Sequence, residues 1–283
     1  MKNKVIGVIG NGFVGGAVIS AFSQTNKVVS YDNNPSQSLN SLHDVVIGSD
    51  FIFVCVPTPM KGVLGGEIDL SIVRSVLDEI QTIKPRKDSI IILKSSMVPG
   101  SAESLIEDYP ELDVVYSPEF LREKTARLDF LNPSRIVLGG KPKLVEKTKL
   151  LFEYRFPHTK LLVTDITTAQ MIKYMANCFL STKVSFMNEM RQAADKLNVN
   201  WEDALRGFCL DGRIGLSHMD VPGPDGEYGF GGKCFPKDIS AFIFLFEELG
   251  VDPLVMKAAW AKNLAVREKY DWADIKGAVS DSE

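Results

Sequence analysis

The segment Lys4-Val-Ile-Gly-Val-Ile-Gly-Asn-Gly-Phe-Val-Gly15 decides the fold of this chain. Its first residues form an apolar run typical of a buried parallel strand, and a helix-like run, 16–22, follows its glycines. The glycines at 10, 12 and 15 have the spacing of a strand–turn–helix connection that leaves backbone N–H groups free for an anion. Gly10 permits the tight turn, Gly12 lets a ligand approach the backbone, and Gly15 lets helix and strand pack closely. We therefore expect a dinucleotide-binding turn formed by Gly10, Gly12, Phe13, Val14 and Gly15.

A carboxylate follows this turn at the distance that a ribose-binding residue requires. The second strand-like run, 27–31, ends at Asp32, roughly 20 residues after the turn. The charge of Asp32 would repel a 2′-phosphate, and no arginine follows it to reverse this preference. The pattern predicts NAD, rather than NADP, as the cofactor.

Composition and charge indicate an ordinary globular enzyme. The chain has 283 residues, 45% of them hydrophobic and 24% charged, with a net charge of -4. This charge gives no electrostatic footprint for nucleic acid or for a membrane surface. No apolar run reaches the length of a membrane span, and the first strand begins where a signal peptide would lie. We expect a cytoplasmic protein that binds neither nucleic acid nor a membrane.

The cysteines point to reduced thiols rather than to a metal centre or disulfides. The four cysteines lie far apart without a C-x-x-C pair, and only three histidines accompany them. A zinc site needs clustered ligands, so no metal is expected.

The first half of the chain predicts an α/β fold. Apolar strand-like runs alternate with helical stretches up to about residue 165, and the clearest of these runs are 51–56, 90–93, 114–116 and 136–138. This alternation predicts a Rossmann-like, doubly wound parallel sheet with helices on both faces. Pro57 and Pro59 follow the run 51–56, so we expect Pro57 and Thr58 at the edge of the sheet beside the cofactor. Alternatively, the prolines only end the strand; the two interpretations are compatible.

The second half predicts a helical domain. Residues 167–196 contain neither proline nor glycine, and their apolar residues recur at helical spacing, which favours one long central helix. Lys173 and Asn177 stand four apart and share a face of this helix. Taken alone, such a pair is more typical of a solvated helix face. We expect three segments: an NAD-binding domain at 1–165, a helical dimerisation domain with catalytic residues at 166–270, and a polar tail at 271–283.

The stretch Tyr228-Gly-Phe-Gly-Gly-Lys-Cys-Phe-Pro-Lys-Asp238 carries a candidate nucleophile. Cys234 follows three glycines, lies between Lys233 and Lys237, and precedes Asp238 by four residues. Neighbouring cations favour the thiolate, which is the reactive form. A structural cysteine in a turn is the alternative, and the stretch alone gives the two about equal weight.

Seven segments in order resemble the UDP-glucose/GDP-mannose dehydrogenase family, and more closely its UDP-glucose 6-dehydrogenase branch. These are GNGFVG with Asp32, CVPTP, LKSSMVPG, SPEFLREKTA, KYMANCFLSTKVSFMNE, DGRIG and GFGGKCFPKD. The resemblance implies oxidation of the C6 alcohol of a nucleotide sugar to a carboxylate, with two NAD and a covalent cysteine intermediate. It also implies a homodimer through the long helix and a role in polysaccharide biosynthesis.

The resemblance assigns catalytic roles to named residues. Cys234 would form a thiohemiacetal and then a thioester, while Lys173 and Asn177 stabilise the developing negative oxygen. Proton transfer and the hydrolytic water would fall to Glu119, Glu123 and Asp238, with Ser96 holding that water in place of the family's threonine. Glu123 and Ser96 would also contact the cofactor.

Substrate contacts follow from the same resemblance. The backbone around Phe120 and Leu121 and the loop at Phe230 and Gly231 would line the sugar pocket, together with Lys173 and Asn177. Arg213 would reach the nucleotide sugar of the partner subunit, a role that suits a guanidinium.

The resemblance has one large departure. Members of the family carry a further α/β domain after the central helices, and no counterpart of it is expected in residues 271–283. Two alternatives to the four-electron enzyme therefore stay open: a two-electron β-hydroxyacid-type dehydrogenase that does not use Cys234, and a non-catalytic subunit that binds NAD or a nucleotide sugar.

Overall fold

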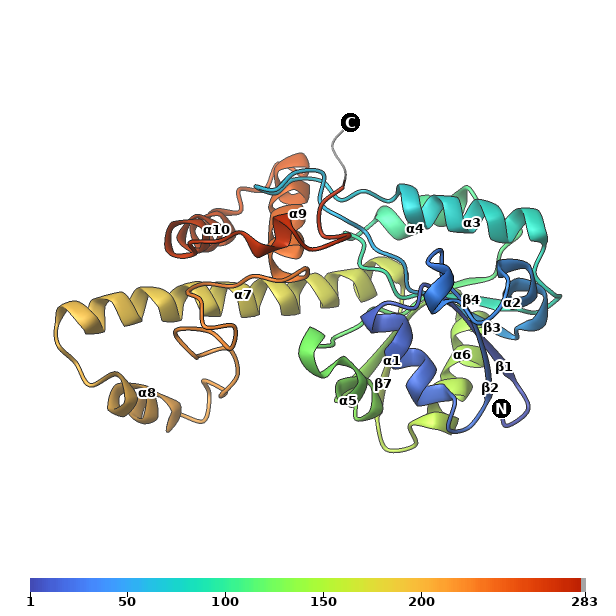
Figure 1. Cartoon of the computed structure of the whole chain (residues 1–283), viewed down its shortest axis with the longest axis horizontal. Coiled ribbons are helices and arrows are strands. Elements are labelled where there is room, and N and C mark those ends of the chain that lie inside the picture. Colours follow the sequence, from blue (N-terminus) through green and yellow to red (C-terminus); the bar gives the residue numbers. More distant parts are fainter. Residues whose placement is uncertain (281–283) are drawn as a thin grey trace. The chain divides into compact units, whose positions relative to one another are not determined.

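A seven-stranded, mostly parallel sheet forms the centre of the first of two compact units (Figure 1). The computed structural model describes residues 1–280, and the strands follow the order β2-β1-β3-β4-β5-β6-β7. Their bounds are β1 Val5–Ile9, β2 Lys27–Tyr31, β3 Phe51–Val54, β4 Ile90–Leu93, β5 Val114–Tyr116, β6 Arg135–Gly140 and β7 Lys160–Thr164. The strand order reverses at β1, which pairs with both β2 and β3. Ligands bind at such a switch point, beyond the carboxyl ends of the strands.

Helices cover both faces of the sheet, as the sequence predicts for a Rossmann-like fold (Figure 1). One face carries α1 (Phe13–Phe22), α5 (Ala126–Leu131) and α6 (Pro142–Arg155), and the other carries α2 (Leu42–Gly48), α3 (Ser71–Ile83) and α4 (Ser101–Glu107). The alternation of side chains along β1 divides the two faces. Ile6 and Val8 join a buried cluster with residues of α1, α5 and α6, whereas a Cβ at Gly7 would lie 2.9 Å from Val45 of α2.

The strand β6 departs from the expected all-parallel sheet, because it pairs with β5 in the antiparallel direction. The connection from β5 contains the short 3-10 turn η2 (Glu123–Thr125) and the six-residue α5. A helix of six residues spans only about 9 Å, which does not return the chain to the opposite edge of the sheet. The first residue of β6, Arg135, therefore lies at the edge where β5 ends. The parallel strand β7 was not predicted.

The long helix predicted near residues 167–196 is α7, which spans Ile166–Lys196. Asp165 precedes it and accepts a hydrogen bond from the N–H of Thr168 at 2.7 Å, the pattern of a helix N-cap. The first compact unit contains Met1–Thr58 and Leu70–Lys173, so α7 passes from this unit into the second.

The second unit contains Pro59–Asp69 and the chain from Tyr174 onward. Its helices after α7 are α8 (Trp201–Cys209), α9 (Phe235–Glu248) and α10 (Leu254–Val266), followed by the 3-10 turn η3 (Asp271–Ala273). The rings of Tyr174 and Phe242 lie 5.2 Å apart and join α7 to α9, while Ser185 of α7 donates a hydrogen bond to the carbonyl of Ala259 in α10 at 2.7 Å.

Residues beyond 270 take part in this packing. Trp272 is fully buried and its indole N–H donates to the carbonyl of Val63 at 2.8 Å. Met60 forms bridges with Ile68 and with Val279. Of the predicted polar tail, residues 281–283 lie outside the described residues. The functional division at residues 165 and 270 stays a prediction.

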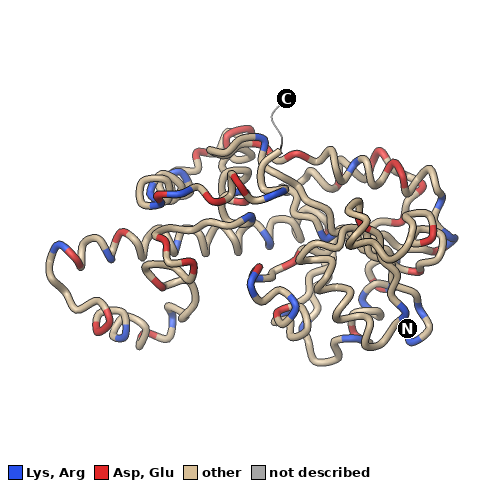
Figure 2. Tube along the Cα trace, in the orientation of Figure 1, with Lys and Arg blue, Asp and Glu red and all other residues tan. Residues whose placement is uncertain are grey.

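Charged residues are interspersed along the trace of both units (Figure 2), in keeping with a net charge of -4. Within residues 1–280, no helix combines the length and the apolar character that crossing a lipid bilayer requires.

Candidate functional site: a dinucleotide turn and two buried carboxylate clusters

The glycine-rich turn leaves the start of α1 open to a ligand. Gly10 has a φ of +90°, which favours glycine, and a Cβ at Gly15 would lie 1.8 Å from the carbonyl oxygen of Gly10. Gly12 is the N-cap of α1, no side chain caps this helix, and a Cβ at Gly12 would meet no atom within 4 Å. The first N–H groups of α1 are thus accessible to a phosphate, as the sequence predicts.

Asp32 lies directly beside this turn. One of its carboxylate oxygens accepts the N–H of Asn11 at 2.6 Å, and the other accepts the N–H of Asn34 at 2.8 Å. These two backbone donors orient the carboxylate at the end of β2, where a ribose hydroxyl would reach it.

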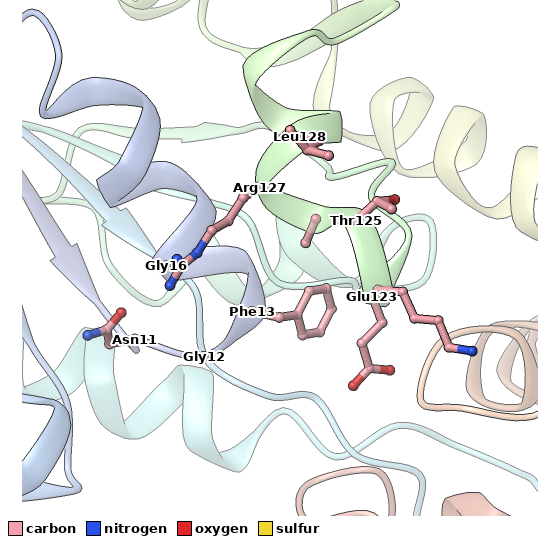
Figure 3. Close-up of a pocket in the computed structure, with 10 residues that line it drawn as sticks. Asn11, Gly12, Phe13, Gly16, Glu123, Thr125, Arg127 and Leu128 are labelled. Carbon is pink, nitrogen blue, oxygen red and sulfur yellow. The ribbon is translucent and has the colours of Figure 1, made fainter. Parts of the chain in front are cut away.

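A pocket of about 370 Å³ opens at the turn (Figure 3). Two parts of the first unit line it: the turn and α1 on one side, and η2 with the start of α5 on the other. The lining residues are Asn11, Gly12, Phe13, Gly16, Glu123, Lys124, Thr125, Ala126, Arg127 and Leu128. The structure thus brings Gly12, Phe13 and Glu123 of the predicted cofactor residues to one pocket. The side chain of Arg127, which the sequence analysis did not single out, extends toward Asn11 and Gly16 (Figure 3).

The other residues predicted for the cofactor lie along the strand ends. Thr58 is buried and donates a hydrogen bond to the carbonyl of Ser96 at 2.8 Å, which joins the loop after β3 to the loop after β4. Pro57 is exposed, Val14 is half-buried within α1, and Ser96 is half-buried.

The first carboxylate cluster joins α7 to the loop after β5. Lys173 donates to Glu119 at 2.7 Å, with side-chain exposures of 2% and 4%, and the second oxygen of Glu119 accepts the N–H of Leu121 at 2.7 Å. The ammonium of Lys173 lies 5.7 Å from the ring centre of Phe120, whose ring also lies 3.8 Å from the guanidinium carbon of Arg135. Burial excludes the solvated-face alternative for Lys173.

A second buried lysine, which the sequence analysis did not single out, holds the same loop. Lys94 is 4% exposed and donates to the hydroxyl of Ser117 at 3.3 Å and to the carbonyl of Pro118 at 3.1 Å. Burial lowers the pKa of Lys94 to about 8; Lys173 acts in the same direction, and Cys55 and Glu119 act against it. Lys94 directly follows the apolar run 90–93, and a lysine at the end of a strand is as compatible with exposure as with burial. The sequence pattern therefore gave no signal for its burial.

The second carboxylate cluster lies in the second unit, on α7 and α9. Asp238 is fully buried, accepts Asn177 at 2.6 Å on one oxygen and pairs with Lys237 at 2.5 Å through the other. The positive charge of Lys237, which the sequence assigns to activation of Cys234, is therefore balanced by Asp238. Asn177 is buried as well, which excludes the solvated-face alternative for this residue.

Cys234 is the N-cap residue of α9, and its carbonyl accepts the N–H of Asp238 at 2.8 Å. A helix N-terminus favours a thiolate. Burial raises the pKa of Cys55 to about 12 and also raises the pKa of Cys178, so both are held as thiols. Cys234 stays the candidate nucleophile, since it is half-buried and lies at the N-terminus of a helix.

The remaining predicted residues have different surroundings. The Phe230 side chain is buried, 6.0 Å from the ring of Trp260, and the side chain of Asn263 binds both the N–H and the carbonyl of Phe230. Gly231 is half-buried in the same loop. Arg213 is exposed at the surface of the second unit and pairs with Asp211 at 2.5 Å.

Known proteins share both halves of this chain. Residues 37–154 match the NAD binding domain of the UDP-glucose/GDP-mannose dehydrogenase family, and residues 167–265 match the central domain of that family. A UDP-glucose 6-dehydrogenase from Rickettsia conorii is 38% identical over 228 residues, which cover 79% of this chain and 51% of that protein. The chain spans about half the length of the first curated relatives that it matches.

Solved structures of other proteins resemble this chain as well. A UDP-glucose dehydrogenase from the hyperthermophilic archaeon Pyrobaculum islandicum has a TM-score of 0.80 at 29% identity, with coverage of 93% of this chain and 68% of that chain. The 3-hydroxyisobutyrate dehydrogenase of Mycobacterium tuberculosis has a TM-score of 0.72 at 18% identity, with coverage of 93% and 94%, a likeness of fold alone. The cofactor is NAD, and the open turn at Gly12 with the oriented Asp32 fits a dinucleotide.

The glycine at 15 gives a test of the turn. Gly15→Ala places a methyl group 1.8 Å from the oxygen of Gly10, so the turn must open, and we expect NAD affinity to fall at least about tenfold with a loss of roughly 1–3 kcal/mol in unfolding free energy. Titration calorimetry and urea unfolding measure both. Gly48→Ala, in α2 and outside the pocket, is the matched control, because its Cβ would meet no atom within 4 Å. It should leave NAD affinity unchanged, and equal behaviour of the two variants would contradict this account.

Lys94 gives a test by pH. Its folded-state pKa of about 8 lies below the ordinary value of 10.5, so between these pH values the unfolded chain binds more protons and stability rises with pH. The gap corresponds to roughly 3 kcal/mol. We expect the unfolding free energy of the wild type to rise by up to that amount relative to Lys94→Met between pH 7.5 and 10.5. If the unfolding free energies of the two proteins depended on pH in the same way, the lowered pKa of Lys94 would be contradicted.

Proposed function

Because the chain belongs to the UDP-glucose/GDP-mannose dehydrogenase family, we propose that it catalyses the NAD-dependent, four-electron oxidation of the C6 alcohol of a nucleotide sugar. UDP-glucose is the substrate to test first, since the curated relatives are UDP-glucose 6-dehydrogenases. One observation carries the proposal: each unit holds a buried cluster of the predicted catalytic residues, Lys173 with Glu119 in the first unit and Asn177 with Asp238 in the second.

The helices α7 and α9 carry the polar residues of these two clusters. Asp238 follows Cys234 by one turn of α9 and accepts Asn177 of α7 at 2.6 Å. Lys173 precedes Asn177 by one turn of α7 and pairs with Glu119 at 2.7 Å. A nucleophile, an amide, an ammonium and two carboxylates are the groups that acyl-type chemistry at a carbonyl carbon needs.

Each group would have a distinct task. NAD, held at the turn of residues 10–15 and by Asp32, would supply the hydride acceptor, and two NAD molecules in succession would be needed, one for the oxidation of the alcohol to the aldehyde and one for the oxidation of the cysteine adduct. Cys234 as a thiolate adds to the C6 aldehyde and forms the S–C bond of a thiohemiacetal, whose oxygen receives hydrogen bonds from Lys173 and Asn177. Oxidation of this adduct leaves a thioester, and water then breaks the S–C bond to give the carboxylate and to release the thiol.

The carboxylates and polar groups at the strand ends would handle protons. Glu119, held by Lys173 and by the N–H of Leu121, would orient the ammonium of Lys173. Glu123 lines the dinucleotide pocket, and together with Ser96 it would position the hydrolytic water. Asp238 would keep the amide of Asn177 turned for donation.

Cys234→Ser tests the covalent step. We expect uronate formation to fall by roughly 10³-fold or more, while NAD affinity stays unchanged, because the dinucleotide pocket lies in the other unit. The purified chain is given UDP-glucose and NAD, and NADH and uronate are counted per sugar consumed; the expected ratio is two NADH per sugar. Cys209→Ser, a thiol of α8, is the control. One NADH per sugar, with no effect of Cys234→Ser, would instead identify a two-electron dehydrogenase.

A homodimer through α7 is the second part of the proposal. Four large apolar side chains of α7 are exposed, Met175 at 60%, Phe179 at 69%, Phe186 at 49% and Met190 at 37%. At 100° per residue they fall within roughly 60° of the helix circumference, which makes a continuous stripe. Exposed apolar stripes of this kind mark interaction surfaces. The dimer would let Arg213 of one subunit reach the nucleotide sugar of the other.

Phe179→Glu tests the dimer. A charge in the middle of the stripe should raise the dimer dissociation constant at least about 100-fold, because burying an unpaired carboxylate is strongly unfavourable. Light scattering after size-exclusion chromatography reports the mass. Leu254→Glu, at a residue of α10 that is 68% exposed, should leave the mass at that of the wild type. A wild-type chain that is monomeric at all accessible concentrations would refute the dimer.

A further inference from the structure

The loop that leads into Cys234 is held by a buried arginine and two aspartates of the second unit. Arg267 follows the end of α10 and its side chain is 2% exposed. Its Nη2 donates to Asp225 at 2.8 Å and to Asp271 at 2.9 Å. Its Nη1 donates to the carbonyl of Tyr228 at 3.3 Å. One guanidinium thus joins the start of the loop, 225–228, to η3.

Asp271 reaches the loop close to the thiol. One of its oxygens pairs with Arg267, and the other accepts the N–H of Gly232 at 3.0 Å, two residues before Cys234. Gly232 has a φ of +73°, a conformation that glycine adopts without strain. Glycine also adopts many other conformations in an unfolded loop. The hydrogen bond from Asp271 selects this conformation.

Asparagine side chains hold the middle of the loop. Asn263 of α10 is fully buried, accepts the N–H of Phe230 at 2.6 Å and donates to the carbonyl of the same residue at 3.0 Å. Asn188 of α7 accepts the N–H of Gly229 at 3.0 Å. Side chains therefore fix the backbone of residues 228, 229, 230 and 232.

Gly231 shows that the loop and the ion pair fit together. A Cβ at this position would lie 2.2 Å from the Nη2 of Arg267 and 2.2 Å from an oxygen of Asp271. Any other residue would separate the loop from the pair. The Arg267–Asp271 pair therefore explains why residue 231 is a glycine, without any reference to a bound sugar.

We propose that Arg267 and Asp271 are positioning residues for the nucleophile: the pair fixes the backbone ahead of Cys234 and thereby holds its thiol at the N-terminus of α9. This inference rests on the proposed function, in which Cys234 is the nucleophile. Neither residue touches the reacting atoms in this role. The pair acts through Gly232 and Tyr228, and it assigns to residues after α10 a part in the chemistry of the site.

The reactivity of Cys234 toward iodoacetamide tests the inference without requiring turnover. Alkylation of each cysteine is followed by peptide mass spectrometry from pH 5 to 10 in the wild type, Asp271→Ala, Asp271→Asn and Arg267→Lys. We expect Asp271→Ala to slow alkylation of Cys234 at pH 7 at least about fivefold and to shift its pH profile upward, because the thiolate loses its place at the helix terminus. Asp271→Asn keeps an oxygen for Gly232 and should recover part of the rate.

The sign of the effect separates positioning from simple electrostatics. Removal of a negative charge near a thiol would by itself favour the thiolate and speed alkylation, equally for the alanine and asparagine variants. Equal or faster alkylation in both variants would therefore overturn the inference. Asp274→Ala, at an exposed residue of the same stretch, is the matched control and should behave as the wild type.

Two further outcomes keep the inference apart from the proposed function. If Cys234 of the wild type is no more reactive than Cys209, the proposed nucleophile itself is wrong. If Cys234 is reactive but both Asp271 variants lose the folded circular-dichroism spectrum, the pair serves the stability of the whole unit, and its assignment as a positioning pair is overturned.

Discussion

The ion pair between Lys173 and Glu119 is the interaction on which the placement of α7 depends. Both side chains are almost fully buried, and a buried charge without its partner would destabilise the fold by roughly 3–5 kcal/mol. Gln170, one turn earlier, donates to the carbonyl of Met97 at 3.1 Å and accepts the N–H of Gly100 at 3.0 Å. The first turns of α7 are therefore fixed to the loops after β4 and β5.

The reversed strand β6 reinforces the same edge of the sheet. In an all-parallel sheet the first residue of β6 would lie at the opposite edge, whereas the antiparallel pairing with β5 brings Arg135 against Phe120. The loop of residues 117–121 is then held by three cations, Lys94, Lys173 and Arg135. The loop carries one carboxylate, Glu119, so the surroundings favour a ligand atom with negative charge.

The sequence predicted those parts of the fold whose signal is local. Glycine spacing located the turn at Gly10–Gly15, apolar runs located β1 to β6, and the absence of proline and glycine located α7. The direction of β6 was not predictable, because it depends on how far the short α5 carries the chain.

The partners of the polar residues could not be predicted from the sequence either. Lys173 and Asn177 matched a solvated helix face as well as a buried one, and only the distant residues Glu119 and Asp238 decide between the two. Asp271 and Trp272 lay in a stretch read as a polar tail, although the packing of Trp272 against Val63 makes them part of the second unit.

The excursion of residues 59–69 out of the sheet-containing unit has a consequence for synthesis on the ribosome. The hydrogen bonds that hold this segment connect Leu64 to Trp260, Val63 to Trp272 and Met60 to Ser280, across separations of 196, 209 and 220 residues. Contacts this distant along the chain form late, since a long loop must close before they contribute. As translation proceeds from the N-terminus, the strands β1 to β7 can assemble while residues 59–69 still lack every one of these partners. The second unit is therefore completed only when residues 260–280 have emerged. Until then its earliest segment is exposed to chaperones and proteases, with Met60 and Ile68, which are buried in the folded structure.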